Sequence, residues 1–350
     1  MKKRRTQSNR RATSQPGAQE QVTPERIIQD LWAARSAQAL VAGTDLDVFT
    51  HIASGKRSAS EIARAARASL HGTRSLLDAL AGLGYLTKDG NGYGLAPVSR
   101  RFLVRNSDAY MGAFVGETKL VWSNWANLTE VVKSGRPVAT VDTEAGGRDF
   151  FPKLVAAIFP ISFGAARAAV AALPAKARKS IRSILDVAAG SAAWSLAFAQ
   201  AIPDARVTVV DYREVTPIAR QFAARFGLSD RYDYIEGNLR ETDFGRNRYD
   251  LVILGHIIHS EGEKWGRKLI KKSARALKPG GMLLIAEMVP NDNRSGPALP
   301  LVFGLNMLLH TTDGDVFTMR EYRQWLKEAG FRKVATIDAP APSPLILATK

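Results

Sequence analysis

The chain has 350 residues, and 49 lysines and arginines outnumber 33 acidic residues, which gives a formal net charge of +16. It contains no cysteine, which excludes disulfides, thiolate metal sites, iron–sulfur clusters and cysteine nucleophiles. At about 150 residues per domain, the length predicts two domains. The longest apolar stretch, 297–309, is shorter than the roughly 20 residues of a membrane helix, so we expect a cytoplasmic protein that does not span a membrane.

Residues 1–22 are predicted to be a disordered basic tail. Six lysines and arginines and no acid lie within residues 1–19, among small and polar residues that cannot bury enough apolar surface to order the segment. No apolar stretch follows the basic start, so the segment lacks the pattern of a secretory signal. A solvated tail is the favoured interpretation, and an arm for nucleic acid or another anionic surface is the alternative.

Residues 23–104 are expected to form a small helical domain with a β-hairpin. A helix is predicted from Thr23-Pro24, and the capping box Ser58-Ala-Ser-Glu61 opens a later one. A further helix is predicted over about Thr73–Leu83, and the turn Asp89-Gly-Asn-Gly92 then indicates a hairpin. Helices followed by a hairpin are typical of a winged helix.

Residues 105–180 are predicted to be helical and are rich in aromatic side chains, which either pack in a core or form a wall for a flat ligand. From Ser183 onward, strand-like and helix-like segments alternate, which predicts a Rossmann-like α/β domain over 181–350, with a parallel sheet covered on both faces. A helix is expected over Glu263–Leu277 and a turn at Lys278–Gly281. Strands are expected at Ile184–Val187, Arg206–Asp211, Tyr232–Glu236, Leu251–Leu254 and Met282–Val289, with two more near the chain end.

The turn after the first of these strands indicates a nucleoside ligand. This turn, Asp186-Val-Ala-Ala-Gly190-Ser-Ala192, is built of small residues, and Asp211 ends the next strand 21 residues past Gly190. Small residues let the backbone approach a ligand, and an acid at this spacing can accept both hydroxyls of a ribose. A dinucleotide needs three glycines for its pyrophosphate, whereas this turn has one glycine and begins with an acid. A ligand without phosphate and with a cationic centre fits better, which points to S-adenosylmethionine.

Residues 24–350 resemble the O-methyltransferases of the plant caffeate and bacterial polyketide-tailoring type. The segment Ser36-Ala-Gln-Ala-Leu40 is similar to that family's dimerisation helix, and Leu185–Ala192 stands where the family has its glycine-rich loop. Val209-Val-Asp211 matches the ribose-binding acid, and Glu236-Gly-Asn238-Leu239 matches the turn beside adenine. The resemblance therefore implies a class I methyltransferase sheet with a winged-helix dimerisation domain, an S-adenosylmethionine cofactor and a homodimer.

The sequence departs from the family pattern at several positions. Ala188 and Ala192 replace two loop glycines, and Asn238 replaces the usual aspartate. A second family carboxylate beside the catalytic histidine would fall near Val316, which cannot serve, although the neighbouring Asp313 and Asp315 offer substitutes. These departures bear on cofactor affinity and catalytic rate more than on the fold.

Two residues are predicted to carry the catalytic chemistry. A phenol, with a pKa of about 10, is a poor nucleophile at neutral pH unless a base takes its proton, and a histidine suits that task. His259 follows the fourth strand and Glu287 follows the fifth, and these strands are neighbours in the expected sheet order. Glu287 can therefore orient the imidazole of His259, and the family resemblance assigns both residues the same roles.

Three further residues are expected to line the acceptor pocket, namely His256, Asn306 and His310. Packing is an alternative for His256, and packing in a core helix is an equal alternative for the other two. His256 and His259 are three residues apart, which would permit a metal pair on a helix, but no third ligand lies nearby in the sequence, so no metal is expected.

Three hypotheses for the function follow. The first is a small-molecule O-methyltransferase acting on an aromatic hydroxyl, with N- or C-methylation left open. The second is a winged-helix DNA-binding regulator with a nucleoside-sensing domain, which the basic charge favours, although the helix over 73–83 offers mainly Arg74 to read bases. The third is a relative that keeps the fold but hydroxylates or decarboxylates. Nucleic acid is not the expected partner.

Overall fold

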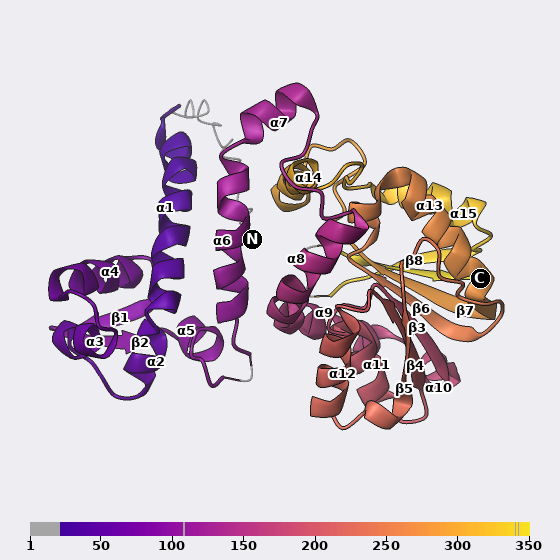
Figure 1. The fold of residues 1–350 in the computed structure, drawn as a ribbon, viewed down its shortest axis with the longest axis horizontal. Helices are drawn as coiled ribbons and strands as arrows, with labels where there is room; N and C mark the ends of the chain where they lie inside the picture. Colours follow the sequence, from indigo (N-terminus) through magenta and orange to yellow (C-terminus); the bar gives the residue numbers. More distant parts are fainter. Residues whose placement is uncertain (1–21, 108, 340, 342) are drawn as a thin grey trace, which may run out of the picture.

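The computed structural model describes residues 22–107, 109–339, 341 and 343–350, so residues 1–21 of the predicted basic tail lie outside the described residues. Figure 1 shows an N-terminal group of helices with a hairpin at one end of the molecule and a large sheet at the other. The helices α6 (Gly112–Trp125) and α8 (Glu144–Ala157) lie between them. The predicted α/β fold with an N-terminal helical domain is confirmed.

The N-terminal group contains five helices and a two-stranded hairpin. The capping box is confirmed, because the Ser58 side chain accepts a hydrogen bond from the Glu61 N–H while the Glu61 carboxylate accepts one from the Ser58 N–H. The helix predicted from Thr73 begins earlier, since the Ser69 hydroxyl caps it by accepting from the Gly72 N–H. The elements are α1 (Glu25–Asp45), α2 (Val48–Ala53), α3 (Ala59–Ala65), α4 (Leu70–Gly82), β1 (Leu86–Asp89), β2 (Gly92–Leu95) and α5 (Pro97–Phe102).

The middle of the chain is helical, as predicted. Its helix α6 packs against both α1 and α14, and so joins the two ends of the molecule. Phe159 stacks on Phe222 of α12 (Thr216–Arg225), and Phe163 lies tilted against Phe226 just past the end of that helix, so both side chains pack partly buried against the core. The elements are α6 (Gly112–Trp125), α7 (Leu128–Ser134), α8 (Glu144–Ala157), α9 (Phe159–Ala172) and α10 (Ala175–Ser180).

No single helix of the described residues is long and apolar enough to cross a membrane. Only α8 and α9 taken together reach that length and composition, and they are bent by 66° relative to each other.

The C-terminal part is a seven-stranded sheet with the order β5-β4-β3-β6-β7-β9-β8. The first five strands in this order are parallel, and β9 runs antiparallel to both neighbours. The residues of α9, α11 and α12 pack in one core cluster, and those of α13 and α15 pack in another, so the sheet has helices on both faces (Figure 1). The strands are β3 (Ser183–Val187), β4 (Arg206–Asp211), β5 (Tyr232–Glu236), β6 (Tyr249–Gly255), β7 (Leu277–Ala286), β8 (Lys333–Ile337) and β9 (Leu345–Thr349).

The helical elements that connect these strands include α11 (Ala193–Ala201), α12 (Thr216–Arg225), the short 3₁₀ helix η1 (Ser229–Arg231), α13 (Ile258–Ala276) and α15 (Met319–Glu328). The helix α14 (Ala298–His310) lies between β7 and α15 in the chain. The helix expected from Glu263 begins five residues earlier, and Gly262 breaks it with a φ of +71°. A Cβ at Gly262 would lie 2.3 Å from the carbonyl oxygen of Asp313, so only glycine fits this break.

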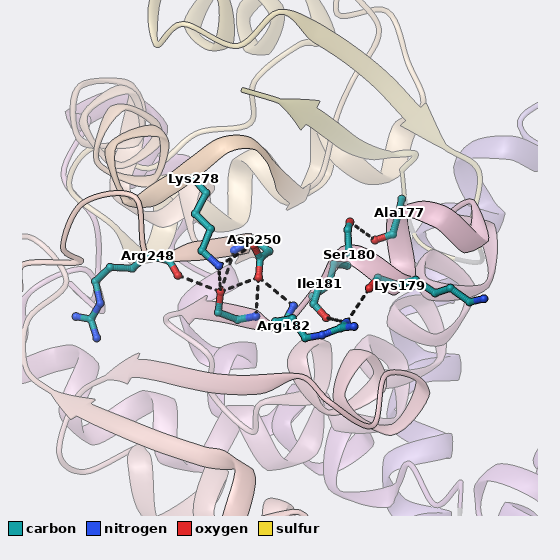
Figure 2. Close-up of polar contacts among 9 residues, drawn as sticks. Ala177, Lys179, Ser180, Ile181, Arg182, Arg248, Asp250 and Lys278 are labelled. Carbon is teal, nitrogen blue, oxygen red and sulfur yellow. Dashed lines mark hydrogen bonds and ion pairs between the residues drawn. The ribbon is translucent and has the colours of Figure 1, made fainter.

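A polar network holds the amino-terminal edge of the sheet together (Figure 2). The Asp250 carboxylate on β6 accepts hydrogen bonds from the backbone N–H groups of Arg182 and Ser183, the Ser183 hydroxyl and the Lys278 ammonium. Burial acts to raise the pKa of Asp250, but these donors outweigh it and leave the pKa below its usual value. The turn predicted at Lys278–Gly281 lies inside β7 instead, as a bulge of four residues opposite Asp250. The candidate site lies at the opposite edge.

Candidate functional site

The carboxyl ends of the parallel strands bring the predicted site residues together. Val187, at the end of β3, lies opposite Val210 of β4 and Leu254 of β6, and Gly255 lies opposite Ala286 of β7. The loops that follow these strands therefore meet at one edge of the sheet, where open α/β sheets bind their ligands.

The loop after β3 approaches the carboxylate of Asp211 closely. The Gly190 N–H donates to Asp211 Oδ2 over 2.7 Å, and the N–H of Tyr212 donates to the other oxygen over 2.8 Å. Gly190 has a φ of +58°, and a Cβ there would lie 2.9 Å from the Val155 side chain of α8. The loop is thus a glycine cradle beside a buried acid, which fits a ribose whose two hydroxyls can donate to Asp211.

Burial raises the pKa of both acids in this part of the site. Asp186 accepts a hydrogen bond from the Ser195 N–H of α11 over 3.2 Å, and desolvation raises its pKa to about 7. Desolvation also raises the pKa of Asp211 to about 6, although the two backbone N–H donors act in the opposite direction. A ligand that brings hydroxyl donors or a positive charge to this site would stabilise the ionised carboxylates.

The two alanines of the loop have a left-handed backbone, which glycine adopts without strain. Ala188 has a φ of +52° and Ala192 a φ of +57°, in the left-handed region that costs an L-residue about 1–2 kcal/mol. The two alanines therefore place methyl groups and backbone strain in the loop.

Asn238 and Leu239 form the turn after β5. The Asn238 side-chain oxygen accepts a hydrogen bond from the backbone N–H of Arg240 over 3.0 Å. The neutral amide of Asn238 therefore stabilises the turn although it lacks the charge of an aspartate. Leu239 is buried, and its carbonyl accepts from the Lys272 ammonium over 2.7 Å. Both residues lie after the strand that pairs with β4, and their contact with a cofactor stays a prediction.

His259 and Glu287 are in direct contact, as the strand order predicts. His259 Nδ1 lies 2.6 Å from Glu287 Oε2, and Glu287 Oε1 accepts from the backbone N–H groups of Ile258 and His259. Burial acts to raise the pKa of Glu287, but the neighbouring imidazole outweighs it, so the net shift is downward. An ionised Glu287 requires the proton on Nδ1 and leaves the Nε2 lone pair free on the other side of the ring.

His256 lies beside this pair. The backbone of His256 has a φ of +59°, and its N–H donates to the Ala286 carbonyl. The centre of the His256 ring lies 6.1 Å from the centre of the His259 ring. Desolvation lowers the pKa of His256 to about 4, so the ring is neutral at physiological pH. Among the described residues, ligand atoms of His256, His259 and Glu287 lie within 4.8 Å of one another. The structure thus adds a third possible ligand, the Glu287 carboxylate, to the histidine pair.

His310 and Asn306 lie on α14. His310 is buried, its Nδ1 lies 2.8 Å from the Asn306 carbonyl, and its Nε2 lies 3.0 Å from the Asn124 amide of α6. Both ring nitrogens thus have protein partners, which favours the packing interpretation of His310. A pocket-lining role for the Asn306 side chain stays a prediction.

The second family carboxylate would fall near Val316, and the structure shows what lies there. Val316 is buried, and the Asp315 carboxylate faces Arg294 at 3.7 Å while its backbone N–H donates to the His259 carbonyl. The Asp313 backbone packs at Gly262. The acidic partner of the His259 ring among the described residues is Glu287.

Two side chains that pack beside the site could not be predicted from the sequence. Val155 of α8 packs on Gly190, and the ring of Phe303 meets that of His259 edge-on with 4.9 Å between centres. Val155 precedes the cofactor loop by some 35 residues and Phe303 lies on the apolar α14, so neither carries a motif.

Comparisons with known proteins agree with this geometry. A family model of the O-methyltransferase domain matches residues 167–332, and a model of the O-methyltransferase dimerisation domain matches residues 31–105. The tetracenomycin polyketide synthesis 8-O-methyltransferase of Streptomyces glaucescens is 30% identical over 334 residues, covering 93% of this chain and 97% of that protein.

Two solved structures have the same fold. A candidate O-methyltransferase from Nostoc punctiforme superposes with a TM-score of 0.84 at 28% identity, covering 95% of this chain and all of that one. Human N-acetylserotonin methyltransferase in complex with S-adenosylmethionine superposes with a TM-score of 0.83 at 24% identity, covering 95% of this chain and 99% of that one, which supports the fold alone.

These matches favour the first of the three hypotheses over a DNA-binding regulator. They cover both the helical N-terminal part and the sheet, and the dimerisation domain supports a homodimer. The chain therefore belongs to the O-methyltransferase family and is an S-adenosylmethionine-dependent O-methyltransferase.

Proposed function

We propose that the enzyme methylates a hydroxyl group of a small aromatic or polyketide-like molecule, with His259 as general base and Glu287 as the residue that orients it. The 2.6 Å contact between His259 Nδ1 and Glu287 Oε2 carries the proposal. The Streptomyces relative, an 8-O-methyltransferase of tetracenomycin polyketide synthesis, supports this class of acceptor.

In the proposed mechanism, Nε2 of His259 accepts the proton of the acceptor hydroxyl as its oxygen attacks. S-adenosylmethionine, when bound, supplies the methyl group on a sulfonium centre. The ionised Glu287 stabilises the imidazolium that forms, and its two bonds from backbone N–H groups at the start of α13 keep its carboxylate in place. Asp211 and the Gly190 loop would hold the ribose, so alignment of the two reactants would supply the rest of the rate.

We further propose that residues 23–104 form the dimerisation domain, 105–180 the linker and acceptor-pocket region, and 181–350 the cofactor domain. The exposed apolar face of α1 supports the interface, because Ile27, Leu31 and Trp32 are 59–66% exposed in one chain. A second copy that covers this face would remove a large apolar patch from water.

A panel of acceptors tests the proposed chemistry. Phenols, naphthols and enolic polyketide analogues are incubated with S-adenosylmethionine, and S-adenosylhomocysteine is measured by its conversion to homocysteine. We expect methyl transfer to at least one hydroxyl, located by mass spectrometry and NMR. Methylation of amines or carbon acids with no hydroxyl methylated in the panel would overturn the proposed O-methylation of aromatic acceptors.

A further inference from the structure

We propose that His256, His259 and Glu287 form an inhibitory binding site for a divalent transition metal, with Zn²⁺ as the expected ion. Two imidazoles and one carboxylate are a donor set that zinc prefers, with a fourth position left for water or an incoming ligand. In the described part of the chain, ligand atoms of these three residues lie within 4.8 Å of one another.

The backbone holds all three side chains in one place. His256 directly follows β6 with a left-handed backbone, and its N–H is fixed on the Ala286 carbonyl of the neighbouring strand. Its ring takes part in no hydrogen bond with the described residues, whereas Glu287 Oε1 is anchored by the N–H groups of Ile258 and His259. The site thus combines a rigid carboxylate with an imidazole that has no hydrogen-bond partner within the described residues.

Small movements would complete the coordination. With zinc bonds of about 2.0–2.1 Å, the ligand atoms of a tetrahedral site are about 3.3 Å apart. His259 Nδ1 and Glu287 Oε2 are now 2.6 Å apart and would separate by about 0.7 Å. A ring nitrogen of His256 lies within 4.8 Å of one ligand atom of each of the other two residues, so it would approach by at most about 1.5 Å to reach the zinc spacing, which rotation of side chains can supply.

Inhibition follows from the position that the metal would take. A metal ion bound to Nδ1 of His259 replaces the proton there, so the proton of the neutral ring must reside on Nε2. Nε2 then has no free lone pair and can no longer take the proton from the hydroxyl of the substrate. The metal also takes the Glu287 carboxylate. Binding depends only on the cluster, whereas the inhibitory effect rests on the proposed role of His259 as base.

The test measures binding apart from activity. The full chain, purified without a polyhistidine tag and treated with chelator, is titrated with Co²⁺, whose visible absorption reports tetrahedral coordination, and Zn²⁺ is then added as a competitor. We expect one ion per chain. His256→Asn, which suits the left-handed backbone, should weaken binding at least about tenfold, and the exposed His71→Gln should not change it.

Two results would overturn the site: a Co²⁺ titration with no saturable absorption in the parent protein, or equal affinity in parent and His256→Asn. Inhibition is measured separately. We expect Zn²⁺ to abolish methyl transfer reversibly on chelation. Stoichiometric binding without inhibition would support the metal site, overturn its inhibitory role and contradict His259 as the base.

Discussion

Replacing Glu287 by glutamine should trap His259 in the wrong tautomer. The glutamate accepts three hydrogen bonds, two from backbone N–H groups and one from the imidazole, whereas glutamine has one oxygen and one NH₂ group. If its oxygen faces Ile258 and His259, its NH₂ donates to Nδ1, and the ring proton moves to Nε2. The ring can then no longer accept a proton from the acceptor.

The alternative orientation is costly. With its NH₂ group facing the helix, Glu287→Gln would leave two backbone N–H donors without an acceptor in a buried position, at about 1–3 kcal/mol each. The productive tautomer would thus be disfavoured by about 2–6 kcal/mol, which corresponds to a loss of kcat of roughly 30-fold to 10⁴-fold.

The assay combines kcat for an acceptor found in the panel with ¹⁵N NMR of the imidazole, which distinguishes the two tautomers. Glu261→Gln is the matched control, because Glu261 lies in the first turn of the same helix and pairs with Arg240. It should change kcat by less than about threefold, as expected of a side chain away from the chemistry. A Glu287→Gln enzyme with the parental kcat, or with its proton on Nδ1, would refute this reasoning.

Three further predictions concern the cofactor loop and the interface. Ribose hydroxyls bind the ionised form of Asp211, and burial raises the pKa of this carboxyl to about 6, so calorimetry should show that the affinity for S-adenosylhomocysteine falls as the pH drops through 6. Asp211→Asn should weaken this affinity at least about tenfold at pH 8 and should remove the pH dependence. Unchanged affinity in the variant would contradict the assignment. In urea unfolding, Ala188→Gly should stabilise the protein by roughly 0.5–1 kcal/mol, because relief of left-handed strain exceeds the entropy gained by the unfolded chain. Ala192→Gly should be nearly neutral, because it also loses a buried methyl group worth about 0.8 kcal/mol; destabilisation of both variants would show that the loop is not strained. Light scattering at micromolar concentration should show a dimer for the parent chain and a monomer for Trp32→Glu, and a dimeric variant would place the interface elsewhere.

Much of the sheet was predictable because its strands carry local patterns. The bounds of β4 and β5 match the expected ranges, since apolar runs alternate there with clear turns. The contact between His259 and Glu287 was predictable as well, because residues that follow neighbouring parallel strands must meet at one edge of the sheet.

The remaining features depend on contacts between segments far apart in the chain. The bulge in β7 is set by its pairing with β6, and the break at Gly262 by the approach of the Asp313 backbone. The packing of Val155 on Gly190 leaves no trace in local spacing. The metal-ligand cluster was not predicted, although the contact between Glu287 and His259 was, because only the structure places the His256 ring beside that same pair.

The most direct test of the proposed mechanism is the rate of methyl transfer by His259→Ala in a single turnover, measured together with the affinity for S-adenosylhomocysteine. A positioned base contributes roughly 10²–10⁴-fold, so we expect the rate to fall by that factor. Affinity should stay within about threefold, because the His259 ring contacts Glu287 and Phe303, away from the ribose acid Asp211. A variant that transfers methyl groups at the parental rate would show that alignment alone drives the reaction and that His259 is not the base.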